Sequence, residues 1–81
     1  MLTGEIAELI EAGLPGARAR VESADGVHFE AVIIAPQFTG KRLRERHQLV
    51  YATLGERMGG AIHALSLQVH TPEEWSERSR R

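Results

Sequence analysis

Residues 17–35 constrain the fold more than any other part of the chain. From residue 17 to residue 23, small or apolar residues alternate with charged ones, which is the period-two pattern of a strand with one solvated face. The Ala-Asp-Gly sequence at residues 24–26 predicts a turn, and the apolar run at residues 27–35 predicts a second, more buried strand that ends at Pro36. Because the connection is short, we expect an antiparallel hairpin.

Helices are predicted on both sides of this hairpin. Thr3 is placed to cap a first helix that stops at Gly13, and its apolar positions are Ile6, Leu9 and Ile10. Residues 41–54 predict the longest helix, with His47 completing the spacing of its apolar face. The apolar members of that face are Leu43, Val50, Tyr51 and Leu54.

A third strand and a final helix complete the order. Glycines break the chain around a short turn at residues 56–58, and residues 62–69 predict the strand. Thr71 can cap the last helix, Pro72 suits its first position, and Glu74 has capping-box spacing. The order α-β-β-α-(short helix)-β-α predicts an α+β fold with a three-stranded mixed sheet covered by helices, because a helical crossover joins parallel strands.

Two histidines draw attention within this arrangement. His28 lies near the start of the second strand, and His63 lies near the start of the third. Adjacent parallel strands lie about 4.8 Å apart and begin at the same edge of a sheet. If these strands are neighbours, both imidazoles can face one small site.

Composition limits the chemistry of such a site. The chain contains no cysteine, so a metal site must use histidine or carboxylate ligands. The net charge of −1 gives no global attraction to nucleic acid, although a local basic patch could supply one. The longest apolar run, residues 31–36, is far shorter than the roughly 20 residues that span a bilayer. With 81 residues and no secretory or transit signal, we expect one domain over residues 1–81, in the cytoplasm.

Four segments in combination resemble the BolA-like protein family. They are residues 38–40 (FTG), 46–51 (RHQLVY), 62–67 (IHALSL) and 71–75 (TPEEW), in family order across nearly the whole chain. Each segment alone is weak, but the combination is specific. The resemblance implies a fold similar to class II KH domains, and this agrees with the order of elements read from the pattern.

The resemblance also implies a partner and a cofactor. Members of this family pair with monothiol glutaredoxins around a bridging 2Fe-2S cluster, and the recurrent histidine ligand corresponds to His63. A second ligand comes from the loop between the first two strands, which carries Cys in one branch and His in another. This chain resembles the His branch, with His28 in that loop. The sulfur ligands would come from the glutaredoxin cysteine and from glutathione, so the protein alone is expected to bind a cluster poorly.

A run of cations marks the start of the longest predicted helix: Lys41, Arg42, Arg44 and Arg46. Cations are slightly unfavourable at the positive end of a helix dipole, so their placement favours an anionic partner. A solvated face, contact with glutathione or an acidic glutaredoxin surface, and contact with nucleic-acid phosphate stay open as interpretations. The sequence GKRL at residues 40–43 lacks the second glycine of the Gly-x-x-Gly loop with which KH domains grip a nucleic-acid backbone.

Two functions therefore compete. The first is a non-enzymatic partner protein in iron–sulfur cluster trafficking or iron homeostasis. The second is a DNA-binding transcriptional regulator, a role attributed to some members of the family. The near-neutral charge and the few aromatic residues favour the first. An enzyme is not expected, because no catalytic triad pattern, phosphate-binding glycine loop or zinc motif occurs. His47 and Trp75 are expected to pack rather than to bind a ligand, and His70 is expected to pack or to face water.

Overall fold

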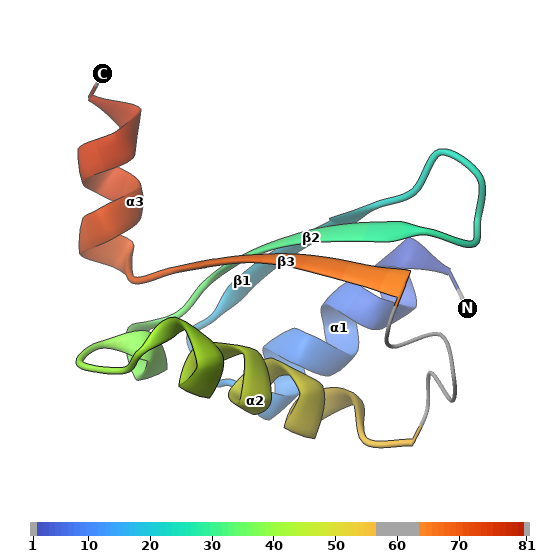
Figure 1. Ribbon diagram of the computed structural model, residues 1–81, viewed down its shortest axis with the longest axis horizontal. Coiled ribbons are helices and arrows are strands. Elements are labelled where there is room, and N and C mark those ends of the chain that lie inside the picture. Colours follow the sequence, from blue (N-terminus) through green and yellow to red (C-terminus); the bar gives the residue numbers. More distant parts are fainter. Residues whose placement is uncertain (1, 57–63, 81) are drawn as a thin grey trace.

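The structure, a computed structural model, describes residues 2–56 and 64–80. Its sheet contains three strands in the order β1-β2-β3, namely β1 (Arg18–Glu22), β2 (Phe29–Ile34) and β3 (Leu65–His70). The helices are α1 (Thr3–Gly13), the 3-10 helix η1 (Pro36–Phe38), α2 (Leu43–Leu54) and α3 (Pro72–Ser79). Helices α1 and α2 cover one face of the sheet, whereas α3 rises from the end of β3 on the other side (Figure 1). The predicted α+β fold is confirmed.

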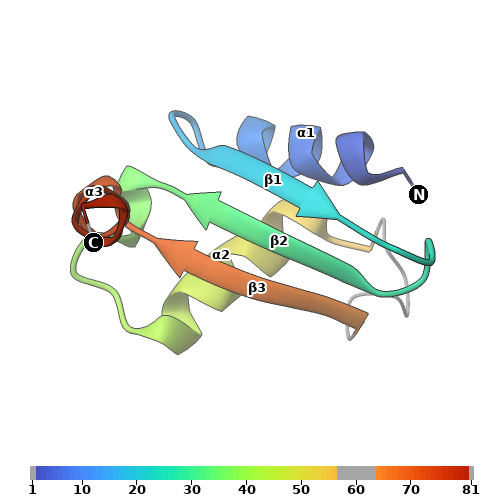
Figure 2. The ribbon, with the colours of Figure 1, turned by 90° about the horizontal axis from the view of Figure 1, so that it is seen from above.

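The pairing of the strands also follows the prediction. β1 and β2 form an antiparallel hairpin, and β2 and β3 run parallel as direct neighbours (Figure 2). The parallel register pairs Phe29 with Leu65 at one end and Ile34 with His70 at the other. The α2 crossover provides the connection that two parallel strands require. The sheet is therefore mixed, and the starts of β2 and β3 lie at one edge.

The predicted start of the second strand is wrong by two residues. Residues 27–35 were expected in the strand, but β2 begins at Phe29. The backbone N–H groups of Val27 and His28 instead donate to the carboxylate of Asp25. An Asp side chain that binds nearby backbone donors offers an alternative to the strand ladder. His28 therefore belongs to the loop that precedes β2.

The other strand boundaries shift slightly. The first strand covers Arg18–Glu22 where residues 17–23 were predicted. The third strand is described from Leu65 to His70 where residues 62–69 were predicted, and positions 62 and 63 lie outside the described residues. The predicted turn at 56–58 also falls partly outside them.

Two helix starts use a glutamate that sequence reasoning did not assign. Thr3 is the first helical residue and not the cap, because the carboxylate of Glu5 accepts a hydrogen bond from the N–H of Leu2 at 3.0 Å. Helix α2 begins two residues later than predicted, because the N–H of Arg42 donates to the carboxylate of Glu45 at 2.9 Å. Both contacts satisfy backbone donors that lack a partner at the start of a helix.

The core lies between the sheet and the two helices that cover it. Its buried members are Ile6, Ile10, Leu14, Phe29, Ala31, Ile33, Ala35, Phe38, Val50, Leu54, Leu65 and Val69. Helix α1 approaches α2 closely at Gly13, where a Cβ atom would lie 2.5 Å from Cγ2 of Thr53. The opposite face of the sheet carries exposed charged residues of β1 and β2 and is uncovered except at one end, where Trp75 of α3 lies near Arg18 and Ile34. Among the described residues, no helix has the length and apolar character to cross a bilayer.

One residue of the predicted apolar face of α2 is not buried. Val50 and Leu54 of α2 are fully buried, but Leu43 is 62% exposed. The first turn of α2 lies beyond the edge of β3, so the sheet does not cover Leu43 (Figure 2). The buried face of α2 is therefore shorter than the periodicity predicts.

Candidate functional site

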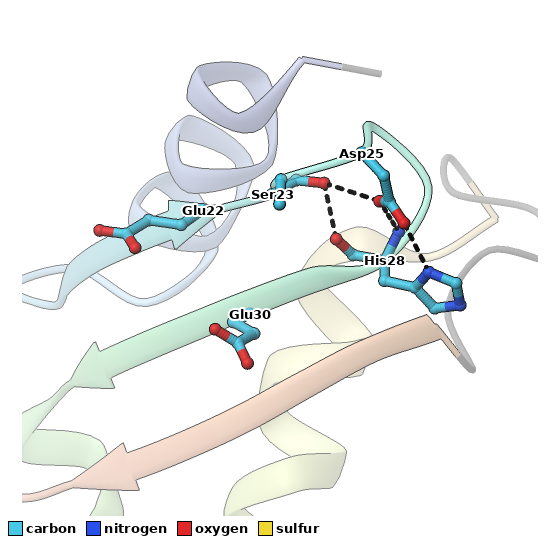
Figure 3. A pocket seen from close by; sticks show the side chains of 6 residues that line it. Glu22, Ser23, Asp25, His28 and Glu30 are labelled. Carbon is cyan, nitrogen blue, oxygen red and sulfur yellow. Dashed lines mark hydrogen bonds and ion pairs between the residues drawn. The ribbon is translucent and has the colours of Figure 1, made fainter.

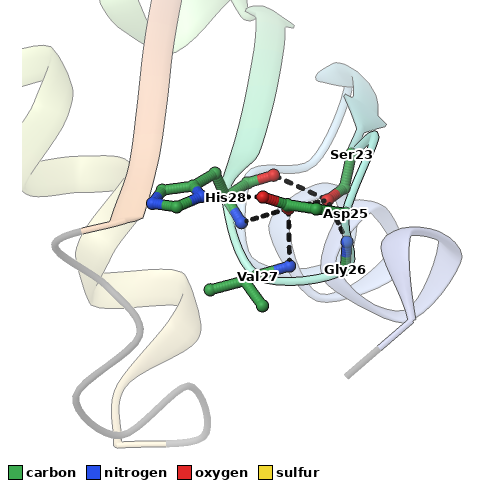
Figure 4. Close-up of polar contacts among 5 residues, drawn as sticks. All are labelled: Ser23, Asp25, Gly26, Val27 and His28. Carbon is green, nitrogen blue, oxygen red and sulfur yellow. Dashed lines mark hydrogen bonds and ion pairs between the residues drawn. The ribbon is translucent and has the colours of Figure 1, made fainter.

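The loop between β1 and β2 is held by a set of short hydrogen bonds (Figure 4). Oδ1 of Asp25 accepts from the N–H of Val27 at 2.9 Å and from the N–H of His28 at 2.8 Å. Oγ of Ser23 accepts from the N–H of Gly26 at 2.9 Å and donates to the carbonyl of His28 at 2.6 Å. Gly26 has a φ of 74°, which glycine adopts without steric cost. The loop thus has a defined shape although it is exposed.

The same loop orients the imidazole of His28. Nδ1 of His28 lies 2.9 Å from Oδ2 of Asp25, so the carboxylate contacts both the backbone and the ring of this residue. The His28 side chain is 76% exposed. Hydrogen bonds from the His28 ring and from the backbone of His28 and Val27 hold the pKa of Asp25 well below its usual range. Asp25 is therefore an anion across the physiological range, and His28 presents an accessible ring.

A depression of about 400 Å³ lies beside this pair (Figure 3). It is lined by Glu22, Ser23, Ala24, Asp25, His28 and Glu30. Glu22 and Glu30 are directly opposite each other in the β1–β2 register, where like charges destabilise a sheet. Neither forms an ion pair with another of the described residues. The surroundings of His28 are consequently acidic and open to solvent.

The start of β3 lies next to this loop. Phe29, directly after His28, pairs with Leu65, the first residue of β3. Figures 3 and 4 both show the His28 ring on the side of the loop that faces this end of β3. His63 lies outside the described residues, so the predicted meeting of the two histidines stays a prediction.

The four cations of the predicted patch do not act as one group. Lys41, Arg42 and Arg44 are exposed and form no ion pair within the described part of the chain. Arg46 is different, since its side chain is only 12% exposed and its guanidinium holds Glu74 at 2.7 and 3.1 Å. Three of the cations are thus free to meet an anion, whereas Arg46 ties α2 to α3.

The residues expected to pack do so. The ring of His47 meets that of Tyr51 edge-on at 6.3 Å, and the rings of His70 and Trp75 lie 5.3 Å apart. Burial is the largest cause of the lowered pKa of His70, followed by the charge of Arg78. His47 lies on α2 and His70 lies at the far end of β3, so both are away from the β1–β2 loop.

Sequence reasoning treated Asp25 only as a turn residue, although it is the residue that shapes the loop and contacts His28. A signal was present in the chain, because a carboxylate three residues before a candidate histidine ligand is close enough to bind its second ring nitrogen. The pattern Asp-Gly-Val-His carries this spacing.

The mixed three-stranded sheet and the order of helices define a small α+β domain. The model of the family described as "BolA-like protein" matches residues 11–74. This chain belongs to the BolA-like family.

Three similar proteins illustrate the relationship. The Escherichia coli protein named DNA-binding transcriptional regulator BolA is 38% identical over 58 residues, which cover 72% of this chain and 55% of the relative. Human BolA-like protein 1 is 42% identical over 52 residues, which cover 64% of this chain and 38% of the relative. The structure of a BolA homologue from Coxiella burnetii has 45% identity and a TM-score of 0.82, and the match covers 94% of this chain and 97% of that one. The chain thus spans about half or less of the two curated relatives.

Proposed function

We propose that this chain is a non-enzymatic partner of monothiol glutaredoxins that helps to hold a bridging 2Fe-2S cluster, in iron–sulfur cluster trafficking or iron homeostasis. Its ligands are His63 and His28, and the glutaredoxin cysteine and glutathione provide the sulfur ligands. The observation that carries the proposal is the oriented, accessible imidazole of His28 beside the start of β3. Imidazole binds iron in its neutral form.

The described residues fit a shared site and not a self-contained one. Within residues 2–56 and 64–80, no three histidine or carboxylate groups lie close enough to hold a metal ion. The chain also has no thiolate to complete a cluster site. A 2Fe-2S cluster with two imidazoles on one iron supplies electron-transfer chemistry at a higher potential than one held by four thiolates. A partner must therefore supply the remaining ligands.

The chain connectivity supports His63 as the second ligand. His63 precedes Leu65 by two residues, and Leu65 pairs with Phe29, which directly follows His28. Two residues of extended chain span at most about 7 Å, and this short sequence separation from Leu65 supports His63 as the second ligand. Leu65 lies at the end of the sheet next to which His28 lies.

Anaerobic reconstitution with a monothiol glutaredoxin, glutathione, iron and sulfide tests this proposal. The wild-type mixture is expected to give a visible circular dichroism spectrum distinct from that of the glutaredoxin homodimer. His63→Ala should abolish the distinct spectrum, and His28→Ala should weaken or alter it. His70→Ala is the matched control, because His70 lies at the opposite end of β3 and packs on Trp75. Identical spectra for the wild type and both ligand variants, or no heterocomplex at all, would refute the proposal.

DNA binding is the second candidate function, and two observations favour it. The Escherichia coli relative carries the name of a DNA-binding regulator, and Lys41, Arg42 and Arg44 form an exposed cationic group in this chain. If this group contacts phosphates, replacing Arg42 and Arg44 by Ala should reduce the slope of log affinity against log salt by about 2. Replacing Arg18 and Arg20, which lie on the uncovered face of the sheet, should leave that slope unchanged. Equal effects of the two pairs would contradict a site at α2.

A further inference from the structure

We propose that Asp25 is a positioning residue that fixes the tautomer of His28 and so presents Nε2 of His28 as its metal-binding atom. The inference rests on the proposed role of His28 as a cluster ligand. The proposed contact specifies Nε2 as the atom of His28 that binds the metal and Asp25 as the residue that selects this atom. Neither follows from the presence of a histidine in the loop.

The contact between the two side chains determines where the ring proton lies. An ionised carboxylate can only accept a hydrogen bond, so Nδ1 of His28, 2.9 Å from Oδ2 of Asp25, must carry the proton. In the neutral ring, the lone pair then lies on Nε2. Histidines that bind metals almost always donate their other ring N–H to a carboxylate, a carbonyl or water in this way.

The loop holds Asp25 in the orientation that this role requires. Oδ1 accepts two backbone N–H groups, from Val27 at 2.9 Å and from His28 at 2.8 Å, and these contacts fix the plane of the carboxylate. Oδ2 is left to meet the ring (Figure 4). Asp25 and His28 are 53% and 76% exposed, and an ion pair this exposed contributes little to stability. The fold therefore does not depend on the ring contact, whereas the direction of Nε2 does.

Asp25→Asn separates the ring contact from the loop contacts. The amide oxygen can still accept the two backbone N–H groups, but the NH₂ group that replaces Oδ2 is a donor. Nδ1 must then accept, which moves the ring proton to Nε2 and removes the lone pair from that atom. Ser23→Ala is the matched control, because Ser23 shapes the same loop through Gly26, the His28 carbonyl and a long 3.4 Å contact with Oδ1 of Asp25, without touching Oδ2 or the ring.

The first measurement uses the free, metal-free protein. Two-bond ¹H–¹⁵N correlations of His28 should be recorded at a pH at which its ring is neutral. They should show the Nδ1–H tautomer in the wild type and in Ser23→Ala. The same spectrum should show the Nε2–H tautomer in Asp25→Asn. A wild-type His28 found as the Nε2–H tautomer would overturn the inference, and this result needs no variant to fold.

The second measurement uses the heterocomplex with glutaredoxin. Asp25→Asn should lose its cluster to a chelator about 10 to 100 times more readily than the wild type, as happens at metal sites when the carboxylate that binds a ligating histidine is replaced. Unchanged retention despite a switched tautomer would overturn the inference. If His28→Ala also keeps its cluster unaltered, the proposed ligand role of His28 fails, and the tautomer measurement on the free protein still decides the Asp25–His28 contact separately.

Discussion

Phe38→Ala is expected to lower the free energy of unfolding by about 3 to 5 kcal/mol, because the substitution removes a fully buried ring and leaves a cavity. A chain of this size has a total stability of only about 4 to 12 kcal/mol, so the substitution should remove a quarter or more of it. Phe38 ends η1, between β2 and α2, and its ring belongs to the buried core, with the guanidinium of Arg46 5.8 Å from the ring centroid. Urea unfolding followed by far-ultraviolet circular dichroism measures the loss.

Leu43→Ala is the matched control for Phe38→Ala. Both residues are large and apolar and lie five positions apart, but Leu43 is 62% exposed. A substitution at an exposed position of this kind changes stability by no more than about 0.5 kcal/mol. Similar losses for the two variants would contradict the burial pattern of this region.

The order of elements could be predicted because each one carries its own local signal. Alternation identified β1, an apolar run identified β2, and Thr71 with Glu74 identified the start of α3 through a capping box that the structure confirms at 3.0 and 3.1 Å. The parallel pairing of β2 with β3 followed from the helical crossover alone. These features depend on residues near one another in the chain.

Side-chain contacts with the backbone could not be predicted from the same periodicity. Residues 27 and 28 belong to the run that predicts β2, yet their N–H groups donate to Asp25 and the strand begins only at Phe29. Periodicity measures which face a residue would occupy in a strand, and it does not measure competition from an Asp side chain. Periodicity likewise says nothing of the contact between the side chains of Asp25 and His28, although their spacing of three residues allows it.

Contacts between segments that are distant in the sequence also could not be predicted from local patterns. Arg46 was grouped with Lys41, Arg42 and Arg44 because the four are close in sequence, but its partner is Glu74, 28 residues away. Leu43 has the spacing of the apolar face of α2, but the sheet does not extend over the first turn of that helix, and Leu43 is exposed. Neither the contact of Arg46 with Glu74 nor the exposure of Leu43 can be predicted from the sequence of α2 alone.

Arg46→Met is expected to lower the free energy of unfolding by about 2 kcal/mol at neutral pH. The substitution removes two hydrogen bonds to a carboxylate, which are worth about 1.5 to 3 kcal/mol in partly buried positions, while Glu74 is 47% exposed and regains water. Met keeps apolar contact with Phe38, but the change also removes the hydrogen bonds from Arg46 to the carbonyls of Lys41 at 2.9 Å and of Val69 at 3.4 Å, so the ion pair needs a separate control. Urea unfolding at several pH values measures the effect.

The pH dependence of this loss identifies its cause. The hydrogen bond from Arg46, assisted by the backbone N–H of Thr71, lowers the pKa of Glu74 from 4.5 to about 2. A carboxyl whose pKa is lower in the folded state binds fewer protons there, so its contribution is complete above its unfolded pKa and is lost as the pH falls through the interval from about 4.5 to about 2. The difference between wild type and Arg46→Met should therefore be largest near neutral pH and shrink across that interval.

Glu74→Gln provides the control for the ion pair. Gln keeps an acceptor for the N–H of Thr71 and so preserves the cap of α3, but it removes the charge that Arg46 binds. In the Glu74→Gln background, Arg46→Met should cost less than it does in the wild type, and the cost should no longer vary with pH in the acidic range. A cost of Arg46→Met that is the same in both backgrounds and at every pH would show that the packing of Arg46 and its bonds to the carbonyls of Lys41 and Val69, and not its bond to Glu74, account for the loss.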